Sequence, residues 1–138
     1  MRTYINDTIY NSLPSDLQNV ISTTKVISGH GKTSGETNFE TQDKLYLLNA
    51  QEVWSTNDYD TSVGTSKQLD YYKNQGVTAS SYAGAIKQYN GSSSAWWLRS
   101  AYSRYTGTYD FLYVTFDGDW NSYGADTSSG VSPAFRIA

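Results

Sequence analysis

The chain has 138 residues, no cysteine, 15% aromatic residues and a formal net charge of −3, which is enough for one domain with a hydrophobic core. The lack of cysteine excludes disulfides, thiolate metal sites and cysteine nucleophiles, and the aromatic content argues against a disordered chain. No lysine- and arginine-rich cluster is present, so no nucleic-acid partner is expected. No apolar run approaches about 18 residues, so no membrane insertion is expected.

Apolar residues at helical spacing predict two short helices at the start of the chain. The first pattern covers residues 4–10, and the second runs from Pro14, a residue suited to a first helical turn, to about Thr23. Residues 26–27 are then expected to form a short strand. Residues 28–41 contain three glycines and are expected to form a loop.

A short buried strand is predicted at residues 45–48, where four apolar residues follow one another. Asn49 and Glu52 have the spacing of a capping box, in which each side chain binds a main-chain N–H at the start of a helix. A helical turn is therefore expected through Trp54. Residues 55–66 are polar and are expected to form a loop.

Two further helices are predicted in the middle of the chain. The first covers residues 65–74 and ends near Gly76. The second begins after Thr78, which would cap it, because apolar residues recur at helical spacing up to Tyr89.

The last third of the chain is predicted to consist of strands. The strands are expected at residues 96–99, 110–116, 120–123 and 131–137. Asp117-Gly118 is a turn dipeptide that predicts a hairpin between the second and third of these, and Pro133 predicts an edge position or a bulge in the fourth. Helices followed by a small, mostly antiparallel sheet indicate an α+β domain.

Alternation along the strand at residues 110–116 predicts which of its side chains are buried. Leu112, Val114 and Phe116 share one purely apolar face, which we expect to face the core, while Phe111 and Tyr113 point outward and are available for contact. The other residues expected in the core or scaffold are Trp96, Trp97, Leu98, Phe135 and Ile137.

A change in composition separates residues 1–99 from residues 100–138. The first segment contains 6 Lys, 3 Glu and 6 Gln, and the second contains none of these. Residues 101–127 hold four Asp and one Arg and so carry the whole excess of negative charge. Tyr mixed with Ser, Gly and Asn is the composition that antibody paratopes use, which favours a ligand-binding surface. The alternative is a β-rich half of the chain, where Tyr and Thr are common.

Four sequence blocks give the chain a resemblance to an uncharacterised bacterial and phage domain family with the motifs DK-x-F-L-L-S-x-x-E, WWLRS and GVRPAF. The blocks are Arg2-Thr3-Tyr4-Ile5-Asn6 with Leu13-Pro14, Asp43-Lys44-Leu45-Tyr46-Leu47-Leu48 continuing to Glu52, Trp96-Trp97-Leu98-Arg99-Ser100, and Gly130-Val131-Ser132-Pro133-Ala134-Phe135. They follow the family's order and spacing over nearly the whole chain, with Ser132 in place of the usual Arg.

This resemblance implies a C-type-lectin-like fold over residues 1–138, with two N-terminal helices packed on a small twisted antiparallel sheet, long loops and terminal segments brought together. Members of this fold group serve as variable proteins of diversity-generating retroelements, in which a reverse transcriptase randomises template adenines. Asn codons changed in this way can encode Tyr, Ser, Asp, Thr, Gly and Ala, but not Lys, Glu or Gln. The resemblance therefore implies a scaffold mostly within residues 1–99 and a variable ligand-binding segment at residues 101–126, within the strand-rich part at 100–138.

The resulting hypothesis is a non-enzymatic ligand-binding or display domain, without a cofactor, on a phage particle or a bacterial surface. The expected ligand is a protein or glycan on a cell surface. Because residues 1–4 lack the apolar stretch of a signal peptide, we expect a trimmed signal or a domain of a longer protein. The residues expected to contact the ligand are Tyr102, Ser103, Arg104, Tyr105, Thr108, Tyr109, Asp110, Tyr113, Asp119, Trp120, Asn121 and Tyr123.

Four alternatives remain open at this point. The domain could be a fixed carbohydrate-binding or adhesion module, or a structural module of a larger secreted protein. Asp117-Gly118-Asp119-Trp120-Asn121 offers closely spaced oxygen ligands for calcium, which needs six to eight of them. Catalysis would have to use His30, the single histidine, and no nucleophile-elbow spacing accompanies it. The formylglycine-generating enzymes of the same fold group depend on cysteine, which this chain lacks.

Overall fold

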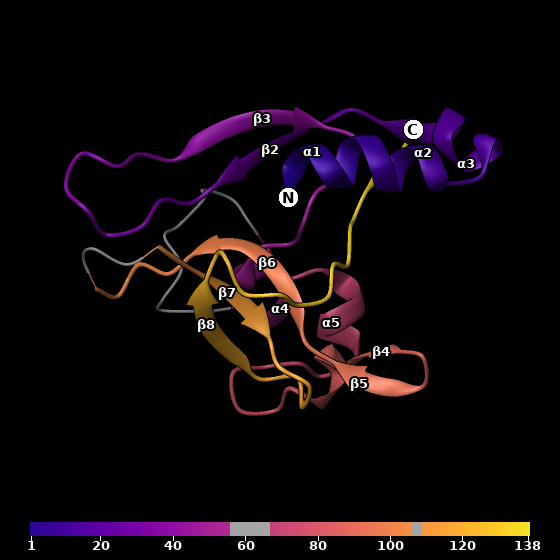
Figure 1. Ribbon diagram of the computed structural model, residues 1–138. Helices are drawn as coiled ribbons and strands as arrows, with labels where there is room; N and C mark the ends of the chain where they lie inside the picture. The colour runs from indigo at the N-terminus through magenta and orange to yellow at the C-terminus, as the bar shows by residue number, and fades with distance from the viewer. Residues whose placement is uncertain (56–66, 106–108) are drawn as a thin grey trace.

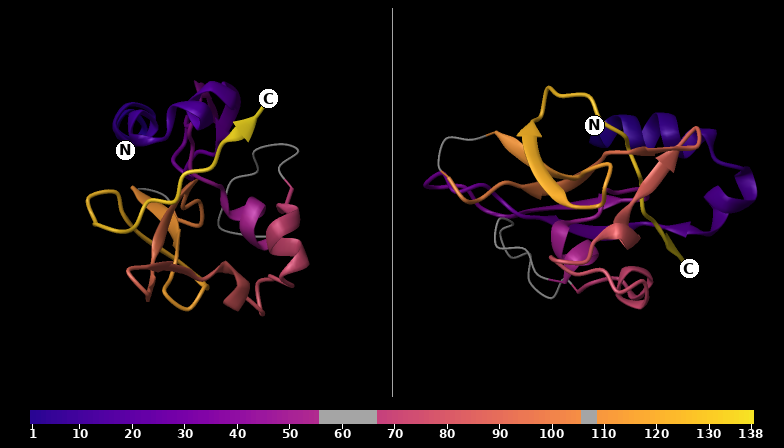
Figure 2. Two further views of the ribbon diagram at one scale, coloured as in Figure 1. Left: turned by 90° about the vertical axis from the view of Figure 1, so that its right-hand side faces the viewer. Right: turned by 90° about the horizontal axis from the view of Figure 1, so that it is seen from below.

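A three-stranded antiparallel sheet lies between two groups of helices in the computed structural model, which describes residues 1–55, 67–105 and 109–138 (Figure 1). The sheet consists of β6 (Trp96–Ala101), β7 (Asp110–Val114) and β8 (Trp120–Gly124). The N-terminal helices pack over one face, and α4 (Ala50–Trp54) and α5 (Asp70–Asn74) pack over the other (Figures 1 and 2). Short helices with small antiparallel sheets confirm the predicted α+β class. None of the helices in the described part of the chain has the length and apolar character needed to cross a bilayer.

The two predicted N-terminal helices are confirmed. The first consists of α1 (Arg2–Tyr4), a π-helical turn (Ile5–Ile9) and α2 (Tyr10–Ser12), which follow one another without a break. Pro14 precedes α3 (Ser15–Val20), which ends earlier than predicted. It ends there because Ile21 and Ser22 form β1 (Ile21–Ser22) and pair with the last strand, β9 (Arg136–Ile137).

A hairpin occupies part of the stretch that was predicted to be a loop. The predicted strand at residues 26–27 is confirmed as β2 (Thr24–Ser28), but it pairs with β3 (Phe39–Asp43) over five residues. The loop prediction is therefore wrong for residue 28 and for residues 39–41. Its basis was the three glycines and the low apolar content. Most residues of β3 are exposed, and its ladder is with β2, whose alternate residues are buried.

Residues 45–48 are buried in most positions, as predicted, but they do not form a strand. Tyr46 alone makes an isolated antiparallel bridge, to Ala134. The segment runs between the two groups of helices, so side chains can be buried without a continuous ladder on either side. The capping box that follows it is confirmed, since Asn49 Oδ1 accepts the N–H of Glu52 and Glu52 Oε2 accepts the N–H of Asn49, each at 2.8 Å.

The predicted helix after Thr78 is wrong. The structure has a single 3-10 turn, Ala83–Ala85, and then a hairpin of β4 (Lys87–Tyr89) and β5 (Ser92–Ser94). Its turn is Asn90-Gly91, with φ of 51° and 80°, and Asn-Gly between two strands is a strong hairpin signal. The helical spacing of the apolar residues up to Tyr89 arose by chance, whereas the Asn90-Gly91 dipeptide correctly indicates the hairpin. The helix predicted at residues 65–74 is shorter, and the loop predicted at residues 55–66 falls mostly outside the described residues.

The predicted hairpin of β7 and β8 is confirmed, with Val114 opposite Trp120 and Phe111 opposite Tyr123. Gly118 in its turn has φ of 92°, and a Cβ there would lie 2.2 Å from the main-chain oxygen of Tyr82, so only glycine fits.

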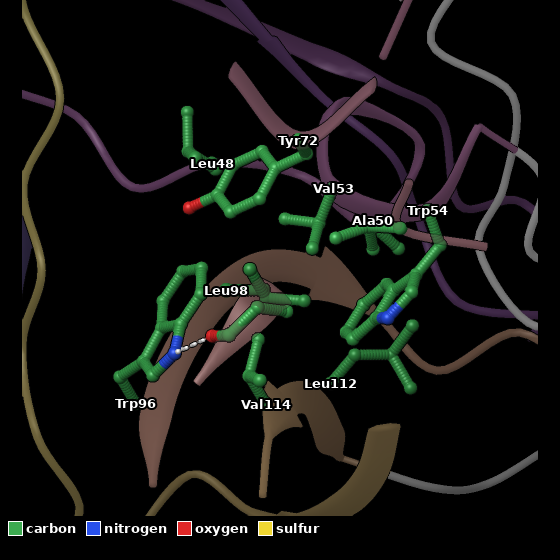
Figure 3. Close-up of a cluster of buried hydrophobic side chains, with 11 residues drawn as sticks. Leu48, Ala50, Val53, Trp54, Tyr72, Trp96, Leu98, Leu112 and Val114 are labelled. Carbon is green, nitrogen blue, oxygen red and sulfur yellow. Dashed lines mark hydrogen bonds between the residues drawn. The ribbon is translucent and has the colours of Figure 1, made fainter. Parts of the chain in front are cut away.

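The first core cluster, called the main core, fills the space between the sheet and α4 and α5 (Figure 3). Its members include Leu48, Ala50, Val53, Trp54, Tyr72, Trp96, Leu98, Leu112 and Val114. Leu112 and Val114 are fully buried, as alternation predicted, but Phe116 is 67% exposed and that prediction is wrong. The strand ends at Val114, and a turn begins in which the N–H of Thr115 binds Asp119 O, so alternation no longer applies to Phe116.

The second cluster, called the second core, lies on the opposite face of the sheet. It contains Ile5, Ile21, Leu45, Leu47 and Trp97. Phe111 and Tyr113 pack against it from β7, so the expectation that both are free on an outer face is wrong. The N-terminal helices, which the alternation argument did not consider, cover that face.

The C-terminal segment makes isolated bridges from Gly130 to Trp96 and from Ala134 to Tyr46 instead of forming the long strand predicted at residues 131–137. Only Arg136 and Ile137 belong to a strand, and Pro133 lies outside it. Phe135 is 37% exposed and Ile137 is 65% exposed, so their assignment to the core is wrong, whereas Trp96, Trp97 and Leu98 are buried as predicted.

Tyr72 makes the main core sensitive to alkaline pH. Burial, with a smaller contribution from Tyr71, raises the pKa of its phenol from 10.0 to about 12. Between pH 10 and 12 the unfolded chain loses this proton while the folded chain keeps it, so stability is complete below pH 10 and falls as pH rises. We expect the wild type to lose about 1.4 kcal/mol from this group at pH 11. Urea unfolding at pH 8 and 11 should show a smaller loss for Tyr72→Phe, and an equal loss in both proteins would contradict the prediction.

Candidate functional site

The motif blocks bind one another and form the scaffold next to the candidate segment. Arg99 of β6 donates from Nη1 to Glu52 Oε2 at 2.7 Å and to Leu47 O at 2.6 Å, and from Nε to Ile27 O at 3.2 Å. Its side chain is 13% exposed and that of Glu52 is 16% exposed. One guanidinium therefore joins β2, the segment before α4, and α4 to the sheet.

Neighbouring motif residues extend this scaffold. Ser100 is fully buried, and its Oγ accepts the N–H of Ala50, which is one of the free donors at the start of α4. Gly130 donates its N–H to Ala95 O at 3.0 Å and accepts the N–H of Trp97 at 2.9 Å. A Cβ at residue 130 would lie 2.6 Å from Ala95 O, so this close approach requires glycine.

The first motif block attaches the N-terminal helix to the same scaffold. The Arg2 guanidinium forms an ion pair with Asp43 at 2.8 Å. Asn6 Nδ2 donates to Leu45 O at 2.9 Å, and Asn6 Oδ1 accepts the N–H groups of Lys44 and Leu45 at 3.1 and 3.0 Å. Contacts between the four motif blocks therefore account for the residue types that the motifs contain. The candidate ligand-binding segment, residues 101–126, is joined to this scaffold.

Three tyrosines of the candidate segment are among its most exposed residues: Tyr105 at 57%, Tyr109 at 77% and Tyr123 at 54%. Tyr109 lies beside Gly124, because a Cβ at residue 124 would be 3.7 Å from the Tyr109 ring. Tyr123 stacks on Tyr113 with ring centroids 5.7 Å apart. We call Tyr109, Tyr113, Tyr123 and Gly124 the tyrosine surface. The ladder register puts Tyr113 and Tyr123 on the second-core face of the sheet, whereas the side-chain direction of Gly124, beside which the Tyr109 ring lies, is on the main-core face. The tyrosine surface lies at the end of the sheet where β7 begins and β8 ends (Figure 1).

A second group of candidates lies in the loop after β6. The Arg104 guanidinium is 5.4 Å from the ring centre of Tyr105, and the rings of Tyr102 and Tyr105 are 6.1 Å apart. Lys32 Nζ donates to Arg104 O at 3.2 Å, which ties this loop to the loop between β2 and β3. Tyr102 also packs against the main core. Ser103 is half-buried, and Thr108 lies outside the described residues.

Three further candidate residues, Asp119, Trp120 and Asn121, make contacts that stabilise the β7–β8 hairpin. Trp120 packs against the main core. Asp119 Oδ1 accepts the N–H of Trp120, and Asn121 Oδ1 accepts the N–H of Ser122, each at 2.8 Å. The ladder register directs these two N–H groups away from β7. Asp119 and Asn121 thus cap donors on the outer edge of β8, a position where free donors invite pairing with another chain.

The turn considered for calcium uses its carboxylates for its own hydrogen bonds. Asp117 accepts a short hydrogen bond from Thr115 Oγ1, and this bond lowers the pKa of the Asp117 carboxyl. Asp119 Oδ1 is bound to the N–H of Trp120. Among residues 1–55, 67–105 and 109–138, no three His, Asp or Glu side chains are grouped to hold a metal ion. His30 lies in the loop between β2 and β3, with Nδ1 2.5 Å from Gly31 O.

An apolar cleft was not found by sequence reasoning. It has a volume of about 230 Å³ and lies between the N-terminal helix, the β2–β3 hairpin and the sheet. Its apolar lining is Met1, Ile5, Val26, Phe39, Leu45, Leu47, Trp97, Leu98, Phe111 and Ala125. These residues come from segments far apart in the chain, so no local pattern could have indicated the cleft. Phe111, one of the lining residues, is opposite Tyr123 in the ladder, so the cleft borders Tyr123.

Comparison with known protein families gives a match over the whole chain. A family model described as "Domain of unknown function (DUF6273)" matches residues 1–138, and the chain belongs to this family. No curated protein and no solved structure matched the chain in the corresponding comparisons.

Proposed function

We propose that this member of the DUF6273 family is a non-enzymatic ligand-binding domain that presents a tyrosine-rich, variable surface on a fixed scaffold. The observation that carries the proposal is the separation of the two kinds of residue. The motif residues Arg99, Ser100 and Gly130 are engaged in scaffold contacts. Between them in sequence lies the segment that contains the exposed Tyr109 and Tyr123. Exposed tyrosine provides a large contact area at low entropic cost.

We further propose a C-type-lectin-like fold and an origin as the variable protein of a diversity-generating retroelement. The pairing of β1 with β9 supports the fold proposal, because it brings the two terminal segments together. The surface would then act in recognition by a phage particle or a bacterial surface, with a protein or glycan as its target.

Trp120 supports the retroelement proposal in an unexpected way. Changing the adenines of an Asn codon cannot produce a Trp codon, so Trp120 would have to be a fixed residue. Its side chain packs against the main core, where a fixed residue belongs. Tyr109 and Tyr123 are both reachable from Asn codons and both exposed.

Sequencing sibling copies of the coding DNA tests the proposal. We expect a near-identical template repeat next to a reverse-transcriptase gene, with differences limited to template adenines. Codons 109 and 123 should differ between siblings, and codons 99, 100 and 120 should not. Differences spread over all four bases, or varied codons for Arg99, would contradict it.

A fixed carbohydrate-binding module is the second candidate, and the exposed Tyr109 ring beside Gly124 favours it. Because Tyr109 is 77% exposed, much of its aromatic ring is accessible to the apolar face of a sugar. A glycan array would show binding that Tyr109→Ala removes, and siblings would then keep Tyr109.

A further inference from the structure

A second, polar pocket is built entirely from scaffold segments. Its lining comes from residues 24–27 of β2, Tyr46, residues 67–70 at the start of α5, Arg99 of β6 and Arg136 of β9. It has a volume of about 440 Å³, which is the size of pockets that hold small molecules. No lining residue belongs to the candidate segment, so this pocket is separate from the tyrosine surface.

Four cationic side chains line the polar pocket, although the whole chain has a net charge of −3. They are Lys25, Lys67, Arg99 and Arg136. Lys25 and Arg99 each form an ion pair with a glutamate. Lys67 and Arg136 are exposed, and neither forms an ion pair with any residue that the structure describes. The pocket therefore has an excess of positive charge, which favours an anionic ligand.

Arg99 gives the pocket a cation in a fixed position. Its Nε and Nη1 atoms make three hydrogen bonds, and the guanidinium carbon is 5.8 Å from the ring centre of Tyr46. Its Nη2 donates to no residue within 1–55, 67–105 or 109–138. A phosphate monoester carries a charge of about −1.5 to −2 and three acceptor oxygens. It can therefore contact Arg99, Lys67 and Arg136 together, whereas a carboxylate has two oxygens in one plane.

Acceptors for hydroxyl groups lie in the same pocket. Asp70 is the one anionic residue of the lining, and it forms no ion pair in the described part of the chain. Gln68 Nε2 donates to Val53 O and to Val77 O, each at 2.8 Å, so its Oε1 is left as an acceptor. A simple anion would leave these acceptors unused. A ligand with hydroxyl groups beside its anionic group would use both them and the cations.

We propose that the polar pocket binds a phosphorylated sugar. The phosphate contacts Lys67, Arg99 and Arg136, and the sugar hydroxyls donate to Asp70 and Gln68. This site goes beyond the proposed function, because it uses scaffold residues alone. Sibling copies of the chain with different tyrosine surfaces would therefore share it.

Amide-resolved NMR titration of the whole protein at low salt tests the proposal. The probes are glucose 6-phosphate, inorganic phosphate and glucose. We expect glucose 6-phosphate to shift the signals of residues 24–27 and 67–70 and to saturate in roughly the millimolar range. Inorganic phosphate should bind about tenfold more weakly, because it lacks the hydroxyl groups that Asp70 and Gln68 accept. Glucose should not saturate these shifts.

Lys67→Gln and Arg136→Gln should each weaken the binding of glucose 6-phosphate about fivefold. Both side chains are exposed and unpaired among the described residues, so thermal unfolding should change little. Lys73→Gln is the matched control, because Lys73 is also exposed and carries the same charge but does not line the pocket. It should change binding less than about twofold.

Asp70→Asn separates recognition of the sugar from attraction of the anion. Loss of the carboxylate charge should strengthen binding of inorganic phosphate, because repulsion is removed. The preference for glucose 6-phosphate over inorganic phosphate should fall below about tenfold, because an acceptor for the sugar is weakened. An unchanged preference would overturn the assignment of the hydroxyl groups to Asp70.

Four results would overturn the proposal as a whole. They are no saturation by glucose 6-phosphate, equal affinity for inorganic phosphate, saturation by glucose, and equal weakening by Lys67→Gln and Lys73→Gln. Tyr109→Ala with Tyr123→Ala should leave glucose 6-phosphate binding unchanged, and a loss there would move the sugar to the tyrosine surface and overturn the pocket. Siblings that do not vary at codons 109 and 123 would overturn the variable surface and leave the pocket supported.

Discussion

Replacing Arg99 with alanine is expected to lower the free energy of unfolding by about 3–5 kcal/mol, because it leaves Glu52 as an unpaired charge in a largely buried position. The same change removes donors to Leu47 O and Ile27 O. A domain of this size has a total stability of about 5–15 kcal/mol, so the variant should be close to unfolded. Urea unfolding followed by circular dichroism measures the loss.

Lys25→Ala is the matched control for this prediction. Lys25 and Glu40 also form an ion pair at 2.7 Å, but their side chains are 57% and 51% exposed. An exposed pair contributes about 0–1 kcal/mol. Similar losses in the two variants would show that burial of the Arg99–Glu52 pair is unimportant. Arg99→Lys should recover only part of the loss, because lysine cannot supply the planar set of donors that reaches both Glu52 and main-chain oxygens.

The double variant Tyr109→Ala with Tyr123→Ala is expected to reduce ligand binding at least about 30-fold while the fold is kept. Central tyrosines in an interface commonly contribute 2 kcal/mol or more on truncation. Both side chains are more than half exposed, so their loss should change the unfolding free energy little. Binding to a panel of bacterial cells, measured by flow cytometry, gives the affinity, and thermal unfolding gives the stability.

Tyr71→Ala with Tyr89→Ala is the control for the tyrosine surface. These residues are 62% and 73% exposed and lie outside the candidate segment. Tyr71 also contacts a second tyrosine, Tyr72, as Tyr123 contacts Tyr113. The control should therefore remove similar exposed area without affecting binding. An equal loss of binding in both double variants would mean that the ligand binds exposed tyrosines non-specifically and not the tyrosine surface.

Predictions from a few neighbouring residues were correct where interactions within a short segment determine its main-chain structure. The capping box of Asn49 and Glu52 and the Asp117-Gly118 turn were both predicted from a few neighbouring residues and both confirmed. The Asn90-Gly91 turn carried the same kind of information, and the helical spacing over it was misleading. Short turn signals are set by main-chain geometry, whereas spacing over ten residues can arise by chance.

Burial of individual side chains was predicted less well where it depends on the position of another helix or on where a strand ends. Leu112 and Val114 were correctly assigned to the core, but Phe116 was not, because the strand ends before it. Phe111 and Tyr113 were expected on a free face that the N-terminal helices in fact cover. Alternation gives the two faces of a strand, and it does not say whether the second face is also covered.

The amino-acid sequence by itself determined the α+β class, the main turns and caps, and the segment in which tyrosine and aspartate replace lysine, glutamate and glutamine. These are properties of short stretches, and short-range interactions fix them. Only the tertiary structure decided that Arg99 joins four segments, that Asp119 and Asn121 cap a strand edge, and that an apolar cleft opens beside Tyr123. Each of these depends on contacts between residues distant in the chain, whose relative positions are fixed when the two cores pack on opposite faces of one sheet.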